Sequence, residues 1–383
     1  MKKKCLLCAK SGLKLFYKIN SFPTYFGAIP AKSYRKIKKF PLEVSYCSKC
    51  NLVQQSKIIK EKYMNEVYSS EYYNCPSPKK NKIGRREIDK FLNFFSFFNI
   101  KKKKILEIAS FDGYLLDKIK TNNDVYGCDP SQESKNLKKK YGSKKIKTLF
   151  YKKGIYKKKE FDIIIFRNLL EHIYDIKKFL ESVKYSLKDN GHIFIDVPNI
   201  KAIVNSGSLG VFFHQHISYF SKNTITNVLN LNGFEVKKIY EGNPNLFVYA
   251  VKKDAGKKIN LKNNDNEFLI KNIKKSKKIK EKILKIFSNK NNSQIALFGM
   301  SALATTIVNF LSKKFRDKIV MLIDNDKEKQ GKILCGYNKV IAKPKDLLKT
   351  DFDKLLVCSY FFKKEIVQSL SLHIKNKKKI ILL

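Results

Sequence analysis

The chain has 383 residues, of which 43% are hydrophobic, and its 80 Lys and Arg outnumber its 33 Asp and Glu to give a formal net charge of +47. This length predicts two or three domains, and the apolar content argues against a disordered chain. The charge fits RNA, DNA or an acidic membrane surface as a partner. However, the lysines are spread over the whole chain, which favours compositional drift towards Lys, Asn and Ile over one binding surface.

The first segment, residues 1–75, is rich in cysteine, proline and aromatic residues. It carries two Cys-x-x-Cys pairs, Cys5 with Cys8 and Cys47 with Cys50. Two such pairs place four thiolates where one tetrahedral ion can bind them, and a set of four leaves no open coordination position. The pattern therefore predicts one structural zinc ion. Chance spacing of cysteines in a core is the alternative, and a redox pair is disfavoured because no thioredoxin-like strand precedes either motif.

The second segment, residues 76–252, alternates short apolar runs with amphipathic stretches. It starts with an expected helix from Lys82 to Phe98 and ends with two expected strands, 233–242 and 246–253. Buried β-branched runs that alternate with helices predict a parallel sheet covered by helices on both faces, which is the α/β fold class. The other expected strands are 104–109, 125–129, 161–166 and 191–198.

The rest of the chain divides into a connector, residues 253–292, and a smaller α/β unit, residues 293–383. The connector is rich in Lys and Asn and contains a charged amphipathic helix from Phe268 to Phe287. The last unit repeats the strand–helix alternation, and its apolar stretch from Ile295 to Leu311 is too short and too interrupted for a membrane span. Because no convincing targeting segment is present, we expect a cytoplasmic protein with reduced thiols.

The run from Ile105 to Gly113, ILEIASFDG, predicts a strand and a tight turn before a helix, and Asp129 ends the next strand. A turn at the carboxyl end of a strand can bind a nucleotide, and the acid can accept both hydroxyl groups of a ribose. Ala109 and Phe111 stand where dinucleotide-binding proteins often have glycine, so a dinucleotide is disfavoured. A purely structural strand, turn and helix is the alternative.

The stretch HQHISYFS, His214 to Ser221, holds two of the five histidines one residue apart. Three explanations compete: metal ligands, a proton-transfer site, or structural packing. A metal site is disfavoured because neighbours along an extended segment point to opposite faces and no third ligand is apparent. His216 is the candidate for proton transfer. Because Gln215 offers no carboxylate, we expect the pKa of His216 to lie near the ordinary value of about 6.5.

Class I S-adenosylmethionine-dependent methyltransferases have motifs that resemble, in order and spacing, the stretches LEIASFDGYLL, GCDPS, FDIIIFRNLLEHI and DNGHIFIDVPN. With the four cysteines, HQHISYFS and the later DNDKEKQGKILCG, the whole chain resembles the zinc-containing sugar C-methyltransferases, which act on nucleotide-linked 4-keto deoxysugars. The resemblance implies a Rossmann-like methyltransferase domain between an N-terminal zinc-binding module and a smaller Rossmann-like α/β domain that binds substrate.

In that family the stretch that matches the histidine pair reads close to Tyr-His-Glu-His, and its second histidine is the general base. The resemblance implies His216 as the base, with His214, Gln215 and Tyr219 in the catalytic set. Phe213 stands in place of the family's Tyr, and Gln215 in place of its Glu. The residues implied for binding the methyl donor are Glu107, Ala109, Ser110, Gly113, Asp129, Asn168 and His172.

The expected function is methylation of a nucleotide-linked keto-deoxysugar at carbon, with S-adenosylmethionine as the methyl donor, by a monomer or homodimer. Such a reaction belongs to surface-polysaccharide or secondary-metabolite sugar biosynthesis. One alternative is O- or N-methylation of a sugar or another small acceptor. A second is methylation of RNA held by the zinc module and the basic charge, which salt-dependent RNA binding would reveal. A third is a non-catalytic binding protein that keeps the fold.

Overall fold

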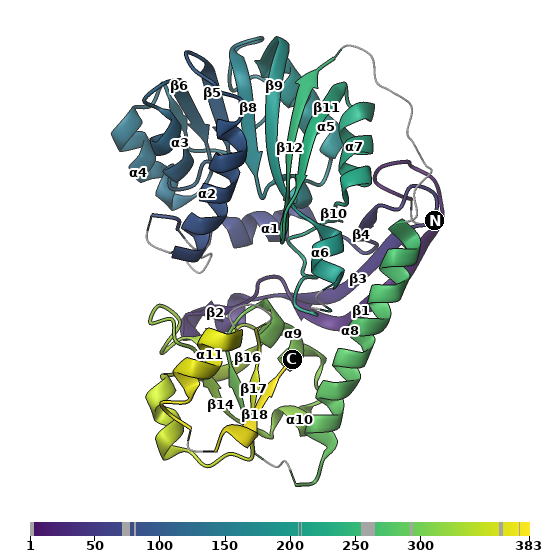
Figure 1. The fold of residues 1–383 in the computed structure, drawn as a ribbon, viewed down its shortest axis with the longest axis vertical. Helices are drawn as coiled ribbons and strands as arrows, with labels where there is room; N and C mark the ends of the chain where they lie inside the picture. Colours follow the sequence, from purple (N-terminus) through teal and green to yellow (C-terminus); the bar gives the residue numbers. More distant parts are fainter. Residues whose placement is uncertain are drawn as a thin grey trace.

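The computed structural model contains two α/β domains at opposite ends of the molecule, with the strands of an N-terminal module between them (Figure 1). This arrangement confirms the predicted fold class. The described residues are 4–70, 77–79, 82–205, 207, 209–253, 265–291, 294–359, 363–374 and 376–383.

The N-terminal module is an antiparallel sheet whose long strands are β1 (Leu13–Pro23) and β3 (Lys39–Cys47). Alternate residues of β3, such as Leu42 and Val44, turn to a buried face, which fixes the register of the pair. β4 (Val53–Gln55) pairs with β3, and β10 (Ser218–Tyr219) comes from much later in the chain to pair with β4. The other elements are β2 (Ala28–Ile29), the 3-10 helix η1 (Ala31–Lys36) and α1 (Glu61–Tyr68).

The middle domain is built on the strands β5 (Lys104–Ile108), β6 (Asp124–Cys128), β7 (Ile146–Lys147), β8 (Phe161–Arg167), β9 (Leu187–Pro198), β11 (Phe234–Glu241) and β12 (Asn245–Lys252). They form one sheet of order β11-β12-β9-β8-β5-β6-β7. β12 is antiparallel to both of its neighbours, and the remaining pairs are parallel. The central strands β5 and β8 are apolar over most of their length because helices cover both faces of the sheet.

Amphipathic helices supply the two layers on this sheet (Figure 1). On one face α2 packs Phe94 and Phe95 against Phe194 of β9. On the other face Leu180 of α5 and Val228 of α7 contribute to a second core. The helices are α2 (Lys82–Ser96), α3 (Tyr114–Ile119), α4 (Gln132–Tyr141), α5 (Ile176–Ser186), α6 (Ile200–Asn205), α7 (Lys222–Leu231) and the 3-10 helix η2 (Leu170–His172).

The C-terminal domain contains the strands β13 (Ile295–Phe298), β14 (Ile319–Ile323), β15 (Ile333–Leu334), β16 (Tyr337–Ala342), β17 (Lys354–Val357) and β18 (Ile380–Leu382). They form a sheet of order β18-β17-β13-β14-β16-β15-β2, in which β15 and β2 are antiparallel to their neighbours. The N-terminal module thus donates β2 to the last domain. The helices are α8 (Asp265–Ser288), α9 (Ala302–Phe310), α10 (Lys313–Arg316), α11 (Lys363–Leu370), η3 (Pro344–Lys349) and η4 (Lys377–Lys379).

The expected strands of the middle domain form within a few residues of their predicted positions, and the C-terminal domain has the expected alternation of strands and helices. The apolar stretch from Ile295 to Leu311 forms β13 and α9. Among the described residues, no helix is both long enough and apolar enough to cross a membrane. The boundaries set after residues 75, 252 and 292 stay predictions, and parts of the expected connector (254–264 and 292–293) lie outside the described residues.

Candidate functional site

The turn that follows β5 places three residues in the left-handed backbone region: Ala109 with φ 62°, Phe111 with φ 44° and Gly113 with φ 72°. Gly113 has a second reason to be glycine, because a Cβ atom there would lie 2.3 Å from Cδ1 of Leu137. Ala109 and Phe111 adopt the same region with side chains, which costs of order 1–3 kcal/mol each and is typical of functional sites. The surrounding fold therefore holds this turn in one shape.

Asp129, directly after β6, holds the turn in place by accepting hydrogen bonds from backbone N–H groups. Its Oδ2 accepts a hydrogen bond from the Phe111 N–H at 3.0 Å, and its Oδ1 accepts one from the Ser131 N–H at 2.7 Å. Burial raises the pKa of this carboxyl group, and the hydrogen bonds that it accepts oppose the rise. Each oxygen retains a lone pair, so the carboxylate can accept two further hydrogen bonds, as the two hydroxyl groups of a ribose would donate.

Glu107 and Ser110 place unpaired polar atoms next to the same turn. The side chains are 4% and 3% exposed. Neither Oε2 of Glu107 nor Oγ of Ser110 has a hydrogen-bond partner among the described residues. Burial raises the pKa of Glu107 well above its usual value, although the nearby Arg167 guanidinium lowers it. Buried polar atoms normally have partners, so these two atoms suit the polar groups of a ligand.

A buried ion pair joins the ends of β8 and β9, where Nη2 of Arg167 lies 3.0 Å from Oδ2 of Asp196. Nδ2 of Asn245 donates to Oδ1 of Asp196 at 2.7 Å. Loss of one partner from such a pair typically costs about 3–5 kcal/mol, so the network holds this edge of the sheet rigidly. Asn168 follows with φ 46°, donates its backbone N–H to the Asp196 carbonyl at 2.8 Å and exposes its side chain.

Glu171, His172 and His216 meet just beyond the end of β8, where one carboxylate oxygen and one nitrogen from each ring lie within 4.8 Å of one another. Burial lowers the pKa of His172 to about 4 and holds that of His216 well below its ordinary value, so both rings are neutral at neutral pH. The expectation of an ordinary pKa for His216 is therefore wrong, because it took the ring to be solvated. The Tyr68 hydroxyl lies 3.0 Å from Nδ1 of His172.

His214 belongs to the same loop, but its ring points away from His216. Its Nε2 lies 3.3 Å from the carbonyl oxygens of Phe22 and Phe40, so the ring bridges two strand ends of the N-terminal module. Alternation along an extended segment does not explain this divergence, because residues i and i+2 of a strand point to the same face. The expectation based on it is therefore wrong in its reason: residues 214–215 form a turn, which separates the rings before β10 begins.

The other residues predicted for the catalytic set surround His216. Gln215 is 5% exposed and Tyr219 is 2% exposed. The ring centroids of Tyr219 and His216 are 5.7 Å apart. Sequence reasoning missed Gln55, whose Nε2 lies 2.7 to 3.2 Å from three backbone carbonyl oxygens of this loop. Gln55 thereby connects the four-cysteine module to the loop that carries His216.

The four predicted cysteines come together at the edge of the N-terminal module. The Sγ atoms of Cys5 and Cys50 are 3.4 Å apart, and those of Cys8 and Cys47 are 3.7 Å apart. Backbone N–H groups two residues after Cys5 and Cys47 donate to their sulfur atoms at 3.4 Å. Zinc with Zn–S distances of about 2.3 Å places tetrahedral sulfur ligands about 3.8 Å apart, so the cluster has the dimensions of a zinc site.

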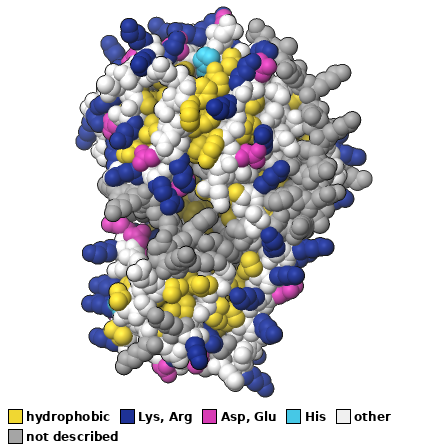
Figure 2. All heavy atoms as spheres, viewed as in Figure 1, with side chains coloured by type: hydrophobic (Ala, Val, Ile, Leu, Met, Phe, Trp, Pro, Cys, Tyr) yellow, Lys and Arg dark blue, Asp and Glu magenta, His cyan; other side chains and the backbone are white. Residues whose placement is uncertain are grey.

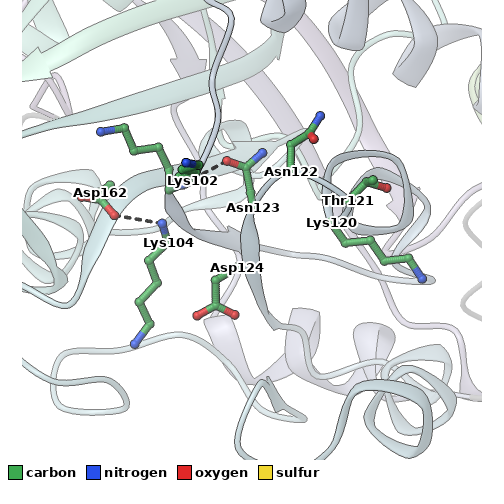
Figure 3. Close-up of a pocket in the computed structure, with 9 residues that line it drawn as sticks. Lys102, Lys104, Lys120, Thr121, Asn122, Asn123, Asp124 and Asp162 are labelled. Carbon is green, nitrogen blue, oxygen red and sulfur yellow. Dashed lines mark hydrogen bonds between the residues drawn. The ribbon is translucent and has the colours of Figure 1, made fainter.

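A cavity of about 530 Å³ lies at the opposite edge of the middle sheet, by the first residues of β5, β6 and β8. Lys102, Lys104 and Lys120 extend around it (Figure 3). Lys104 is paired with Glu160 at 2.8 Å. The described residues that line the cavity include none of the predicted site residues. Lys and Arg side chains are scattered over the visible face of the molecule and do not form one stripe (Figure 2).

Comparison with known proteins identifies the middle domain. Residues 81–239 match the family described as "Methyltransferase domain". The chain carries a methyltransferase domain over these residues. Residues 291–381 match a second family, described as "C2185-like, N-terminal".

Part of this chain is similar to the C-methyltransferase NovU of Streptomyces niveus, with 28% identity over 74 residues. That match covers 19% of this chain and only 18% of the relative's length. A solved S-adenosylmethionine-dependent methyltransferase from Aquifex aeolicus is 18% identical, with 42% of this chain and 89% of that chain covered and a TM-score of 0.35. The 1,6-didemethyltoxoflavin-N1-methyltransferase of Burkholderia thailandensis is 13% identical, with 56% of this chain and 96% of that chain covered and a TM-score of 0.39.

Within the methyltransferase domain the site residues collect at one edge of the sheet. The turn 109–113, Asp129 and the pair Glu171–His172 follow the carboxyl ends of β5, β6 and β8, and these ends of parallel strands lie side by side. α1 and β10 lie on the same side, towards the C-terminal domain (Figure 1). A cofactor on the turn and an acceptor beside His216 would therefore share one edge.

Proposed function

We propose that this protein transfers a methyl group from S-adenosylmethionine to a carbon atom of a nucleotide-linked keto-deoxysugar. The observation that carries the proposal is the neutral, largely buried His216, next to Glu171 and His172 at the edge of the sheet where the cofactor turn ends. A neutral imidazole at such a position can act as a general base. The partial similarity to a C-methyltransferase supports carbon as the acceptor.

The methyl donor would bind at the turn 109–113. Asp129 would accept the ribose hydroxyl groups, and the unpaired atoms of Glu107 and Ser110 would face polar groups of the donor. Gly113 has no side chain to obstruct this turn, and Asn168 and His172 follow the neighbouring strand. S-adenosylmethionine supplies an electrophilic methyl group on a sulfonium, and the protein supplies position and the exclusion of water.

Asp129→Ala is expected to weaken S-adenosylmethionine binding by about 1.5–3 kcal/mol, the range for a charge-assisted hydrogen bond. The variant loses the acceptor for the ribose and also the bond that holds the Phe111 N–H. Isothermal calorimetry measures the change. Asp124→Ala, an exposed acid at the other end of β6, is the control and should bind normally. Unchanged affinity in Asp129→Ala would contradict this placement of the donor.

The proposed reaction begins with the acceptor. A keto group acidifies the C–H bond next to it, and His216 removes that proton while the electron pair remains on the acceptor as an enolate. The enolate carbon would then attack the methyl group in line; the bond from that methyl to the sulfonium sulfur breaks, and its electron pair leaves with S-adenosylhomocysteine. Gln215, the chain neighbour of the base, and Tyr219, whose ring packs near it, are both buried, so water would have little access to the enolate.

In deuterated water, the wild-type enzyme is expected to exchange the acidic C–H of a keto-sugar nucleotide even when no methyl donor is present, because proton removal precedes methyl transfer. Mass spectrometry or NMR of the sugar measures the exchange. An enzyme that methylates its acceptor and never exchanges a carbon-bound proton would not use this mechanism. O- or N-methylation would then replace it, with His216 as the base for a hydroxyl group or as a wall of the pocket.

Two further proposals concern the outer parts of the chain. The four-cysteine cluster would hold one structural zinc ion, which its sulfur distances support. The C-terminal domain would bind the nucleotide of the substrate. In support, Asp324 after β14 accepts the Met300 N–H at 2.7 Å, as Asp129 accepts the N–H of Phe111, so both domains use a carboxylate to hold the turn that precedes a helix.

A further inference from the structure

The carboxyl group of Glu171 is buried, and no other described residue donates a hydrogen bond to it. The residue is 1% exposed, and neither carboxyl oxygen is paired among the described residues. A buried polar group in this state loses its hydration and gains no bond in return, which destabilises the fold. The fold gains no stability from this buried carboxyl group, so we look for the reason for its burial in the site that it faces.

Glu171 faces both imidazole rings of the site through one oxygen. Its Oε1 lies 3.8 Å from Nε2 of His172 and 3.9 Å from Nε2 of His216. The two ring centroids are 4.8 Å apart and the rings are nearly perpendicular, at 81°. These gaps are slightly longer than hydrogen bonds, and such contacts often tighten when substrate binds.

Two contacts fix this arrangement. The Ile217 N–H donates to the backbone carbonyl of Glu171 at 2.7 Å, which ties the loop of His216 to η2. The Tyr68 hydroxyl at Nδ1 of His172 holds that ring with Nε2 towards Glu171. Gln215, next to His216 in the chain, carries an amide and no charge. Glu171 is therefore in position to provide the carboxylate that Gln215 cannot.

We infer that Glu171 is a positioning residue of the methyltransferase: its carboxylate orients the His216 and His172 rings and stabilises the positive charge that His216 acquires when it takes a proton. This inference rests on the proposed function. The proton of the acceptor C–H moves to the neutral His216 ring, and the electron pair stays on the acceptor. The imidazolium then lies beside the Glu171 carboxylate until it releases the proton to water.

The ionisation of Glu171 gives the reaction its pH dependence. Burial raises the pKa of Glu171 well above the usual value, the backbone N–H of Glu171 itself opposes the rise, and the nearby Asp196, itself paired with Arg167, adds to it. The carboxyl group is neutral at low pH and becomes the working carboxylate as the pH increases. Activity should therefore rise with pH through a limb that belongs to Glu171.

The other titratable groups around His216 do not produce this limb. Burial and the neighbouring His172 keep the pKa of His216 well below 6.5, so the base is already neutral when Glu171 ionises. Burial raises the pKa values of Tyr68 and Tyr219, so both hydroxyl groups stay protonated. The limb should consequently disappear when Glu171 is replaced by an isosteric amide.

Glu171→Gln tests the inference. We expect kcat for methyl transfer to fall by about 10- to 10³-fold, less than the roughly 10⁴-fold loss for a directly hydrogen-bonded orienting carboxylate, because the gap here is wider. The limb that belongs to Glu171 should disappear, so that activity is limited only by the protonation of His216 at lower pH, and donor affinity should not change. Glu171→Asp keeps the charge on a shorter side chain, so it should keep the limb and recover part of the rate.

A purely structural role would give a different pattern. Because the amide replaces a buried group that has no partner, Glu171→Gln should melt at or above the wild-type temperature while losing activity. Glu181→Gln, an exposed carboxyl group on α5, is the matched control and should match the wild type in rate and in pH profile. A folded Glu171→Gln with wild-type kcat and an unmoved limb would overturn the inference, as would a Glu171→Asp variant that lacks the limb.

Failure of the proposed function can be distinguished from failure of this inference. If the wild type exchanges no carbon-bound proton of a keto-sugar nucleotide, carbon methylation is wrong. If the wild type exchanges that proton and Glu171→Gln exchanges it at the same rate, the role of Glu171 is wrong.

Discussion

Replacement of His216 by alanine is expected to lower turnover by about 10²- to 10⁴-fold and to leave S-adenosylmethionine affinity nearly unchanged. His216 is the proposed base, whereas the turn 109–113 and Asp129, the proposed donor site, contain no atom of this loop. The variant should also lose deuterium exchange at the acceptor carbon. Steady-state kinetics and calorimetry on the same preparation measure both quantities.

His214→Ala is the natural comparison, since the two histidines are one residue apart. His214 hydrogen-bonds to carbonyl oxygens of Phe22 and Phe40, so its loss should appear as a lower melting temperature of the N-terminal module. Its effect on kcat per folded molecule should be smaller. A His216→Ala enzyme with wild-type turnover would remove His216 from the reaction. An equal loss in both variants would point to the shape of the loop and not to the base.

The fold was predictable where local patterns dominate. The apolar runs that became β5, β8 and β9 are strands buried on both faces, a pattern that their sequences carry by themselves. β2 and β10 could not be predicted, because each has two residues and forms only by pairing with a strand from another part of the chain. Such strands are defined by tertiary contacts that no local periodicity reports.

The candidate site also has one part that the sequence could predict and one part that only the fold reveals. The turn 109–113 and Asp129 follow strands that are adjacent in sequence, so their meeting could be inferred from spacing. Glu171 and His216 come from separate segments, and only the fold brings them together. A signal for Glu171 was present, since it follows the end of a predicted buried strand. No pattern in the sequence indicated Gln55.

Purified without added metal, the protein is expected to contain one zinc ion per chain, and Cys50→Ser is expected to lose it. A closed thiolate site contributes its binding energy to folding. The cluster joins the chain start to β3, and Cys5, Cys47 and Cys50 pack in one core with strands of the methyltransferase domain. We therefore expect the variant, or the wild type after chelation, to melt about 10 °C lower. Because a loss of 1 kcal/mol lowers the melting temperature by about 2–4 °C, this shift corresponds to a loss of roughly 3–5 kcal/mol in the free energy of unfolding.

The loss of zinc should also affect the reaction, although the cluster does not contain the base. β4 pairs with both β3 and β10 in the sheet of the N-terminal module, and Gln55 of β4 hydrogen-bonds to the loop that contains His216. A loosened module should therefore lower kcat before the methyltransferase domain unfolds, while donor affinity is kept. Cys335→Ser is the control: this cysteine is buried outside the cluster, so the variant should keep its zinc even if it melts earlier. A metal-free wild type whose melting temperature does not respond to a chelator would show that the four thiols pack as ordinary core residues.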